Sequence, residues 1–420
     1  MISHRETVAD SCAVEAGPAF KSAHFGGEGE GVRLLRGENI EPGSLRWVNT
    51  RTWPAQHLAG CEHLLMMEGD LVLGMDRPIV SAGLKLAEVG RGDLPALLVQ
   101  RVARLRANAI DGRYLYHWLS TPGFAARLQR AATGTQLPHI TLRDIREYPV
   151  PRYGPAAERR IVAILEEHLS DLDDADRSFG DAAARLERLT TALLWSATHG
   201  VGGSRRVMLD EIAEVRLGRQ RSPKNHTGPR MRPYLRAANV DWDRLRLDDV
   251  AEMNFSASEE DTYRLMPGDI LLAEASGSAA EVGKSALYAG VPSNVCFQNT
   301  LLRVRCHHAE PEFVQKYLLA EARAGRFMPE SRGVGINHLG RARLASLVVD
   351  LPTETLQRET AQRVTELLQQ VARTEALTER QRVRGKSLRS AILNAAFSGR
   401  LTGHGSDTDV ISELAEEESA

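Results

Sequence analysis

Two stretches of the chain carry a long and regular alternation of apolar and polar residues. Along residues 158–198, apolar side chains recur in steps of three and four, with one skip, at Ile161, Leu165, Leu169, Leu172, Phe179, Ala183, Leu186, Leu189 and Leu193. A second stretch repeats the pattern more loosely, at Val364, Leu367, Leu368, Val371, Leu377, Leu388 and Ile392. This spacing predicts two long amphipathic helices with a narrow apolar seam, each about 40 residues and roughly 60 Å long.

The two stretches belong to a duplication of the whole chain. When the sequence is compared with itself at an offset of about 200 residues, short matches follow one another in nearly one register. They pair Leu34-Leu-Arg-Gly-Glu-Asn-Ile40 with Tyr234-Leu-Arg-Ala-Ala-Asn-Val240, Gly69-Asp-Leu-Val-Leu73 with Gly268-Asp-Ile-Leu-Leu272, and Leu189-x-x-Ala-Leu-Leu with Leu388-x-x-Ala-Ile-Leu. The chain is therefore two copies of one unit.

Each copy begins with about 150 residues of short β-branched runs, Gly/Pro turns and one helical segment, near residues 111–131 or 310–327. Since a narrow seam cannot be buried by one helix, we expect the two long helices to form an antiparallel pair with pseudo-two-fold symmetry. Ordinary core helices of two plain domains are the alternative, and their length without an internal proline disfavours it. We predict an α+β fold, in which two duplicated mixed α/β domains are held apart by a pair of long coiled-coil helices.

The predicted boundaries follow from this pattern. The first domain takes residues 1–152 and the first helix residues 153–202. The second domain takes residues 203–351 and the second helix residues 352–402. The remaining residues, 403–420, are small, polar and acidic, and we expect this tail to be mobile.

Composition narrows the class of protein. The 420 residues are 42% apolar and 26% charged, and no apolar run approaches the length that spans a bilayer. The N-terminus carries no hydrophobic signal segment, and the four cysteines form no disulfide framework, so we expect a cytoplasmic protein with reduced thiols. With a net charge of −2, any contact with nucleic acid must come from local basic patches.

Motifs of catalysis are missing. The segment from Gly277 to Lys284 has five residues between its glycines, whereas a phosphate-binding P-loop has four. The sequence contains no Pro-Pro pair of an adenine methyltransferase, no Glu-x-Lys or Asp-x-Lys of a nuclease and no Gly-x-Ser-x-Gly. Cys296, Cys306, His307 and His308 do not have zinc-finger spacing. We therefore expect no catalytic residue, no metal site and no cofactor in this chain.

One segment of the second copy is strongly basic. Residues 205–236 hold three acids and nine basic residues, namely Arg205, Arg206, Arg216, Arg219, Arg221, Lys224, Arg230, Arg232 and Arg236. The loop within it suits phosphate oxygens and base edges, although a solvated basic loop without a ligand would have the same composition. The corresponding stretch of the first copy mixes Lys21, Arg33 and Arg36 with three glutamates, so the two domains are expected to contact different surfaces.

The order of domain, long helix, domain and long helix resembles the specificity (S) subunit of Type I restriction-modification systems, the HsdS family. The matching motifs are Pro149-Val-Pro151 with Glu158-Arg-Arg-Ile-Val162, Leu351-Pro352 with Gln357-Arg-Glu359, the segment from Ser387 to Leu401, and Gly268-Asp-Ile-Leu-Leu272 with its Ser276-Gly277 loop. The resemblance covers residues 1 to about 402, and it departs from the family in a short, acidic start and a weak segment at 353–360.

The resemblance implies a non-catalytic reader of double-stranded DNA that serves in phage defence. Each domain would be a target-recognition domain in the major groove at one half of a split target, and the helices would set the distance between the halves. The helices would also dock two methyltransferase (M) subunits, through polar residues such as Glu166, Glu167, Asp171 and Arg185. S-adenosylmethionine would then belong to the M subunits, and ATP with Mg²⁺ to motor-nuclease (R) subunits.

Candidate DNA contacts follow from the basic and polar loops. In the second domain they are Arg219, Arg221, Lys224, Arg236, Asn239, Ser276, Ser278, Lys284 and Arg332. In the first domain they are Lys21, Arg36, Asn39, Arg77 and Lys85. Three pairs are equivalent in the repeat (Arg36 and Arg236, Asn39 and Asn239, Lys85 and Lys284), so we expect them to serve phosphate contacts or structure. Arg219, Arg221 and Arg332 lack equivalents and are better candidates for reading sequence.

Two alternatives remain at this point. One is the specificity chain of a system whose partner fuses methyltransferase and nuclease in a single polypeptide. The other is a duplicated coiled-coil adaptor with protein-binding domains and no role on DNA. Affinity for duplex DNA that falls steeply with salt would exclude the adaptor, because phosphate contacts release counterions.

Overall fold

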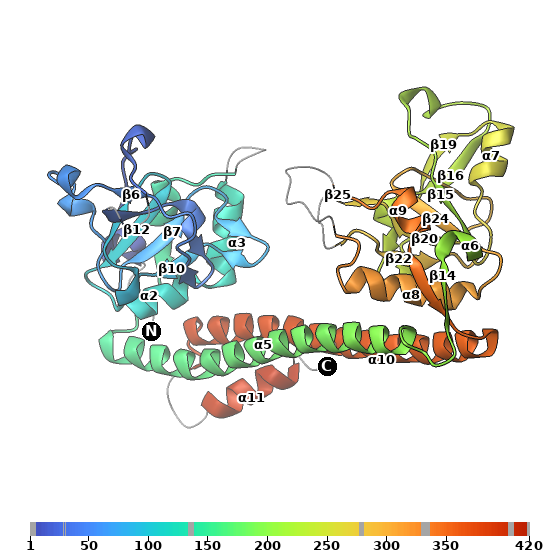
Figure 1. Cartoon of the computed structure of the whole chain (residues 1–420). Helices are drawn as coiled ribbons and strands as arrows, with labels where there is room; N and C mark the ends of the chain where they lie inside the picture. The colour runs from blue at the N-terminus through green and yellow to red at the C-terminus, as the bar shows by residue number, and fades with distance from the viewer. Residues whose placement is uncertain are drawn as a thin grey trace. The chain divides into compact units, whose positions relative to one another are not determined.

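The computed structural model describes residues 6–27, 29, 31–132, 138–276, 281–328, 337–401 and 407–417. The chain forms two compact units. Unit 1 comprises residues 1–178 and 380–420, and unit 2 comprises residues 179–379. Two helices of 44 residues each, α5 (Pro155–Thr198) and α10 (Glu354–Phe397), contribute to both units. Each unit therefore holds one α/β part, one end of α5 and one end of α10 (Figure 1).

The α/β part of unit 1 contains two sheets. A four-stranded antiparallel sheet has the order β10-β7-β12-β2, and a three-stranded sheet has the order β11-β3-β6, in which β11 and β3 are parallel. The elements before α5 are β1 (Glu6–Thr7), α1 (Val8–Ser11), β2 (Cys12–Ala16), β3 (Val32–Leu35), β4 (Ile40–Glu41), β5 (Ser44–Leu45), β6 (Thr52–Trp53), β7 (Leu71–Gly74), β8 (Ile79–Val80), β9 (Gly83–Leu84), β10 (Leu86–Glu88), β11 (Ala96–Leu98), β12 (Val102–Ala107), α2 (Gly112–Leu119), α3 (Pro122–Ala131), α4 (Leu142–Arg146) and β13 (Pro149–Val150).

Unit 2 repeats these two sheets strand for strand. Its four-stranded sheet has the order β22-β20-β24-β15, and in its three-stranded sheet β16 is parallel to β23 and antiparallel to β19. The elements are β14 (Arg205–Met208), α6 (Leu209–Ile212), β15 (Ala213–Leu217), β16 (Met231–Leu235), β17 (Val240–Asp241), β18 (Arg244–Leu245), β19 (Ala251–Asn254), α7 (Ala257–Tyr263), β20 (Ile270–Ala273), β21 (Ala275–Ser276), β22 (Ser285–Leu287), β23 (Cys296–Phe297), β24 (Leu301–Cys306), α8 (Pro311–Arg323), β25 (Asn337–His338), α9 (Arg341–Ala345) and β26 (Val348–Leu351). The predicted duplication is confirmed.

In the four-stranded sheets, the central strands β7 and β20 are buried on both faces, to which successive residues of a strand point in turn. In β7, Leu71 and Leu73 join a core with helix residues such as Tyr114, whereas Val72 joins the core of the three-stranded sheet. In unit 2, Leu272 and Leu271 divide in the same way. This explains why these strands appear as continuous apolar runs in the sequence.

Both sheets carry the same buried ion pairs. Arg106 in β12 donates two hydrogen bonds of 2.7 Å to the carboxylate of Asp70, and Arg305 in β24 does the same to Asp269. Asp70 and Asp269 have nearly no exposed surface. Removing either arginine would leave a buried carboxylate without its partner, which costs about 3–5 kcal/mol.

The long helices pack side by side, as predicted (Figure 1). In unit 1, Arg382 Nε of α10 donates to Asp176 Oδ1 of α5 over 2.9 Å, and Arg389, further along α10, contacts Leu169, earlier on α5. Later residues of α10 therefore contact earlier residues of α5, so the two segments are antiparallel. In unit 2, Leu194 of α5 and Val364 of α10 share one apolar cluster.

The apolar seam differs from the sequence pattern toward the end of α5. Leu189 is 54% exposed, and the buried positions there are Thr190, Leu194 and Thr198. Leu194 packs against Leu319 of α8. The seam of α5 thus turns to face the α/β part of unit 2, a contact that periodicity along one helix cannot reveal.

The acidic tail also differs from the expectation of mobility. Residues Asp407–Glu417 form helix α11 in unit 1. Leu414 is 5% exposed, and Val410 and Ile411 pack against the same core as Phe397. These three apolar residues share one helical face, which the average composition of the tail conceals.

Within the described residues, no helix has the length and hydropathy needed to cross a membrane.

Candidate nucleic-acid interface

Within the basic segment 205–236 of unit 2, a loop begins where β15 ends, at Gly218. A Cβ at this position would lie 2.2 Å from the carbonyl oxygen of Gln298, so only glycine allows the chain to run this close to β23 and its loop. The next residue, Arg219, continues the contact through a hydrogen bond of 3.1 Å from its backbone N–H to the carbonyl of Phe297. The start of the segment is therefore held against the protein core.

Arg219 is a structural residue in this arrangement. Its guanidinium donates to both carboxylate oxygens of Glu259 (2.9 and 3.0 Å) and to the carbonyl of Asn254 (2.9 Å), and it lies 4.8 Å from the ring centre of Phe255. The residue is only 8% exposed. The hypothesis that Arg219 reads bases is not supported, because its hydrogen-bonding groups are directed to partners within unit 2.

Other arginines of the segment are paired as well. Arg230 and Arg232 both bind the buried carboxylate of Glu260, at 2.8 and 3.0 Å, and their hydrogen bonds hold the pKa of Glu260 below its usual value. Arg236 forms an ion pair with Asp249. The acids come from elements that follow the basic segment in the chain, so the local excess of charge is largely neutralised in the fold.

Arg221 and Lys224 are the exposed cations of the loop. Lys224 lies in a short 3₁₀ turn at Pro223–Asn225, and Arg221 contacts the ring of His226, with 3.3 Å between Nε and Nε2. Neither residue forms an ion pair with another described residue. Both can therefore reach a phosphate or a base edge without giving up an intramolecular salt bridge.

Asn39 and Asn239 stabilise the same turn in the two units. Each side-chain oxygen accepts the backbone N–H of the arginine three residues earlier, Arg36 or Arg236, over 3.0 Å. Each amide donates to the backbone carbonyl seven residues later, over 3.1 and 2.9 Å. Both asparagines are buried, which favours a structural role over a phosphate contact for this pair. Arg36 and Arg236 remain partly exposed beside these turns.

Lys85 and Lys284 also bind within their own units, and they do so differently. Lys85 donates to the carbonyl of Gly37, and its burial lowers its pKa. Lys284 pairs with Glu281 (2.6 Å) and approaches Asp241 (3.7 Å), and its side chain is 14% exposed. Neither ammonium group is available to a phosphate in this state. Of the two roles expected for these lysines, phosphate contact or structure, this arrangement favours structure.

Arg77 and Ser276 occupy equivalent places just beyond β7 and β20. Arg77 is exposed, has a φ of 45°, and donates its backbone N–H to the carbonyl of Pro138 over 2.8 Å. The backbone of Ser276 pairs with Asn337. Ser278 and Arg332 lie outside the described residues. Lys21 is exposed next to the 3₁₀ turn Ser22–His24.

The structure adds exposed cations that the sequence analysis did not single out as contacts. Arg51 in unit 1 and Arg205 in unit 2 are exposed and form no ion pair with other described residues. Counting charge within a sequence window could not find Arg51, because a single arginine between neutral residues gives no local excess. The signal that distinguishes it is the absence of a nearby acid in the fold.

The described residues offer little reactive chemistry. Burial raises the pKa of the Cys12 and Cys296 thiols to about 12, so neither forms a thiolate nucleophile near neutral pH. Within the described ranges, no three His, Cys, Asp or Glu side chains lie together as a metal site requires.

Known proteins supply the context for this fold. No family model matches the chain. It is 33% identical over 153 residues to the Type I restriction enzyme EcoAI specificity subunit of Escherichia coli, a match that covers 36% of this chain and 26% of that protein. It is 30% identical over 129 residues to the MjaVIII specificity subunit of Methanocaldococcus jannaschii, covering 30% of each protein. These matches thus span under a third of either relative.

The similarity in fold to a solved structure covers much more of the chain than the similarity in sequence. A solved chain from work on complex assembly and conformational transition of the type I R-M system superposes with a TM-score of 0.68. The match covers 94% of this chain and 97% of that one, at 20% identity, and it establishes the shared fold of duplicated α/β parts with two long helices. In sequence the chain is thus similar, over part of its length, to Type I restriction enzyme specificity subunits, and over nearly its whole length it shares the fold of the chain from the type I R-M system.

Proposed function

We propose that this chain is the sequence-reading subunit of a Type I restriction-modification complex. Each unit would read one half of a split DNA target, and the paired helices would dock M subunits. The chain itself would carry out no chemistry: S-adenosylmethionine would belong to the M subunits, and ATP with Mg²⁺ to the R subunits. In this assignment, residues 1–152 and 203–351 are the two recognition domains.

The observation that carries the proposal is the duplication with divergent surfaces. The two units share their strand order and buried ion pairs, whereas their exposed cations differ. Two equivalent scaffolds with different surfaces are what a reader of two unlike half-sites requires. A protein that binds one symmetric ligand would have no need for the divergence.

The candidate DNA contacts divide by their surroundings. Arg221 and Lys224 in unit 2 and Lys21 and Arg77 in unit 1 are exposed and stay the leading candidates. Arg36, Arg236, Ser276, Ser278 and Arg332 stay predictions, and Arg51 and Arg205 join them. Phosphate contacts from such residues would position the protein, and contacts to base edges would specify the target.

The test is to map methylated bases in host DNA when the chain is expressed with the M subunit encoded beside it. The proposal predicts a split motif, methylated on both strands. A matched pair of variants, Arg221→Ala and Arg219→Ala, separates the roles within the loop. Arg221→Ala should weaken duplex binding and keep the fold, whereas Arg219→Ala should lower the stability of unit 2. Absence of any motif, with an active M subunit and a soluble complex, would contradict the proposal.

A further inference from the structure

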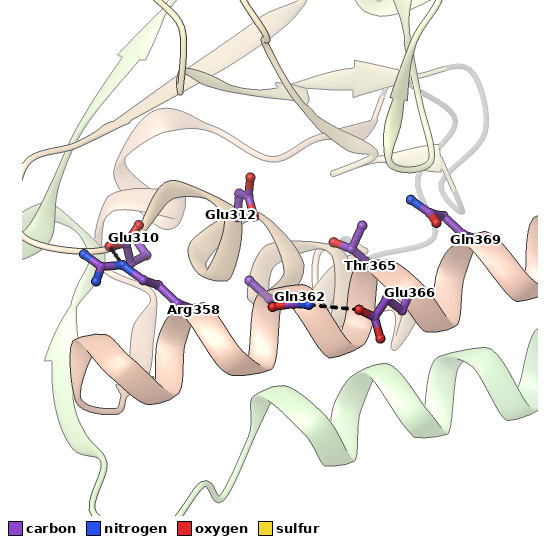
Figure 2. A pocket seen from close by; sticks show the side chains of 8 residues that line it. Glu310, Glu312, Arg358, Gln362, Thr365, Glu366 and Gln369 are labelled. Carbon is purple, nitrogen blue, oxygen red and sulfur yellow. Dashed lines mark hydrogen bonds and ion pairs between the residues drawn. The ribbon is translucent and has the colours of Figure 1, made fainter.

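Unit 2 has an acidic groove where α8 meets the first turns of α10. The groove has a volume of about 540 Å³, and Figure 2 shows Glu310, at the start of α8, joined to Arg358 of α10, with Glu312 close by on α8. Arg358 Nε binds Glu310 over 2.7 Å, and Gln362 donates to Glu366 over 3.0 Å. Glu312 is exposed and forms no ion pair or side-chain hydrogen bond with any described residue. The groove thus has three carboxylates on its lining, and of these only Glu310 pairs with the guanidinium of Arg358.

The equivalent place in unit 1 is occupied by an arginine of the chain itself. Arg113 lies in the first turn of α2, as Glu312 does in α8, and both positions are offset by 199 residues, as are the starts of α5 and α10. Arg113 Nε binds Glu166 of α5 over 2.6 Å, and its Nη1 binds Glu88 over 2.5 Å. A guanidinium therefore bridges helix and α/β part in unit 1.

In unit 2 the bridge is lost by charge reversal. Glu312 replaces Arg113, and Thr365 replaces Glu166. Among the described residues, Glu312 and Glu366 therefore lie on the groove without an ion-pair partner, and Arg358 is engaged by Glu310 and Glu354. Carboxylates arranged around an open groove favour a guanidinium, whose planar fork can donate to two oxygens at once.

We propose that this groove receives an arginine side chain of a partner protein, which would pair with the carboxylates of Glu312 and Glu366. The inference rests on the proposed function, in which that partner is the M subunit docked on unit 2. One M subunit would insert an arginine between α8 and α10, and the M subunit on unit 1 would find the equivalent place already filled. The two docking sites would then differ in their dependence on charge.

The test uses the full chain and the M subunit encoded beside it. Glu312→Arg would place a cation in the groove, and Glu252→Arg, on the exposed surface of β19, makes the same change of charge elsewhere in unit 2. Calorimetric titration of the wild-type chain should show two M subunits bound. Glu312→Arg should weaken one of the two binding steps by about 100-fold and leave the other unchanged. Glu252→Arg should bind both M subunits as the wild type does.

A photo-crosslinking residue in place of Gln362 identifies the occupant. The captured M-subunit peptide should contain an arginine whose replacement by alanine weakens the same binding step, with no further loss when it is combined with Glu312→Arg. Wild-type affinity in Glu312→Arg, or a captured peptide without such an arginine, would overturn the inference. A wild-type chain that binds no M subunit would contradict the proposed function itself, and this result is visible without any variant.

Discussion

The two units solve the same structural problem, the junction between the α/β part and the end of a long helix, with different chemistry. In unit 1, the ring of Phe397 lies 5.2 Å from Tyr114 and 5.0 Å from Trp118, centre to centre. In unit 2, the ring of His199 stacks between Trp195 (3.7 Å) and Tyr317 (4.1 Å). An aromatic contact forms both junctions, but only the second uses a histidine ring.

The polar contacts of the junctions differ too. His199 Nε2 lies 2.9 Å from Glu321 Oε1, and this carboxylate is almost fully buried. In unit 1, the hydroxyl of Tyr153 donates to the backbone carbonyl of Phe397 over 2.8 Å. The comparison shows that the fold requires a well-packed contact between the long helix and the α/β part, and that different side chains can form it. The same freedom on the exposed surfaces would let two copies of one scaffold read different DNA.

The largest effect is expected from Phe397→Ala. The side chain is 7% exposed and belongs to the core that includes α11, so its loss leaves a cavity among aromatic rings. We expect unit 1 to lose about 3–5 kcal/mol of stability. Hydrogen exchange followed peptide by peptide should show faster exchange in β7 and β12 and little change in β20 and β24. Equal loss in both units would contradict a junction that serves unit 1 alone.

A second prediction concerns pH. His117 of α2 is buried, and its two ring nitrogens have no hydrogen-bond partner among the described residues. Burial, with the charges of Arg113 and Arg389, lowers its pKa to about 4. In the unfolded chain this histidine is protonated below about pH 6.5, whereas in folded unit 1 it is protonated only below about pH 4. The free energy of unfolding therefore falls between these pH values, by at most about 3 kcal/mol.

His117→Phe tests that prediction by removing the titrating group. The difference in unfolding free energy between pH 7 and pH 5 should be smaller in the variant than in the wild type. Carboxylates that titrate in the same range cancel in this comparison. In unit 2 the equivalent residue is Lys316, which is paired with Asp243 over 2.5 Å, so Lys316→Met should leave the dependence on pH between 5 and 7 unchanged. An identical pH dependence in wild type and His117→Phe would refute the assignment.

A smaller effect is expected at the junction of unit 2. His199→Phe keeps a ring between Trp195 and Tyr317 but leaves the buried carboxylate of Glu321 without its hydrogen bond. We expect a loss of about 1–3 kcal/mol, confined to unit 2. Adding Glu321→Leu should restore part of that loss, because the unpaired acceptor is then removed. A double variant that is less stable than His199→Phe would show that Glu321 has another function in the fold.

The smallest effect on stability is expected at the exposed loop. Arg221→Ala should change the unfolding free energy by no more than about 0.5 kcal/mol. Its effect should appear in binding to duplex DNA: if Arg221 contacts a phosphate, the slope of log affinity against log salt should decrease by about 1. Measuring affinity at four salt concentrations decides the matter. A large loss of stability with an unchanged salt slope would assign Arg221 to the fold, like Arg219.

The architecture was largely predictable because it is periodic and repeated. The apolar spacing gave two long helices close to the observed bounds at Pro155–Thr198 and Glu354–Phe397, and the matched segments gave the duplication. The end of α5 was less predictable, since its buried face is determined by Leu319 of α8, far away in the chain. Helix α11 was not predicted, because the composition of residues 403–420 is acidic on average and gives no sign of the apolar face.

The candidate site was harder to predict, for a physical reason. A run of arginines in sequence indicates a basic surface only when their partners are not supplied by other elements. Glu259 and Glu260 on α7 bind three of those arginines, and no count along residues 205–236 includes them. Likewise, the equivalence of Asn39 and Asn239 indicated a shared role, and their burial in a turn favours a structural one.

The central claim is that each unit reads one half of a split target. The most direct measurement is to map methylated bases in host DNA for the chain expressed with its M subunit, with and without the double change Arg221→Ala and Lys224→Ala in unit 2. The account predicts a split motif in the wild type, and a variant motif in which one half is relaxed or poorly methylated while the other half is unchanged. A contiguous motif, or a change in both halves together, would contradict it.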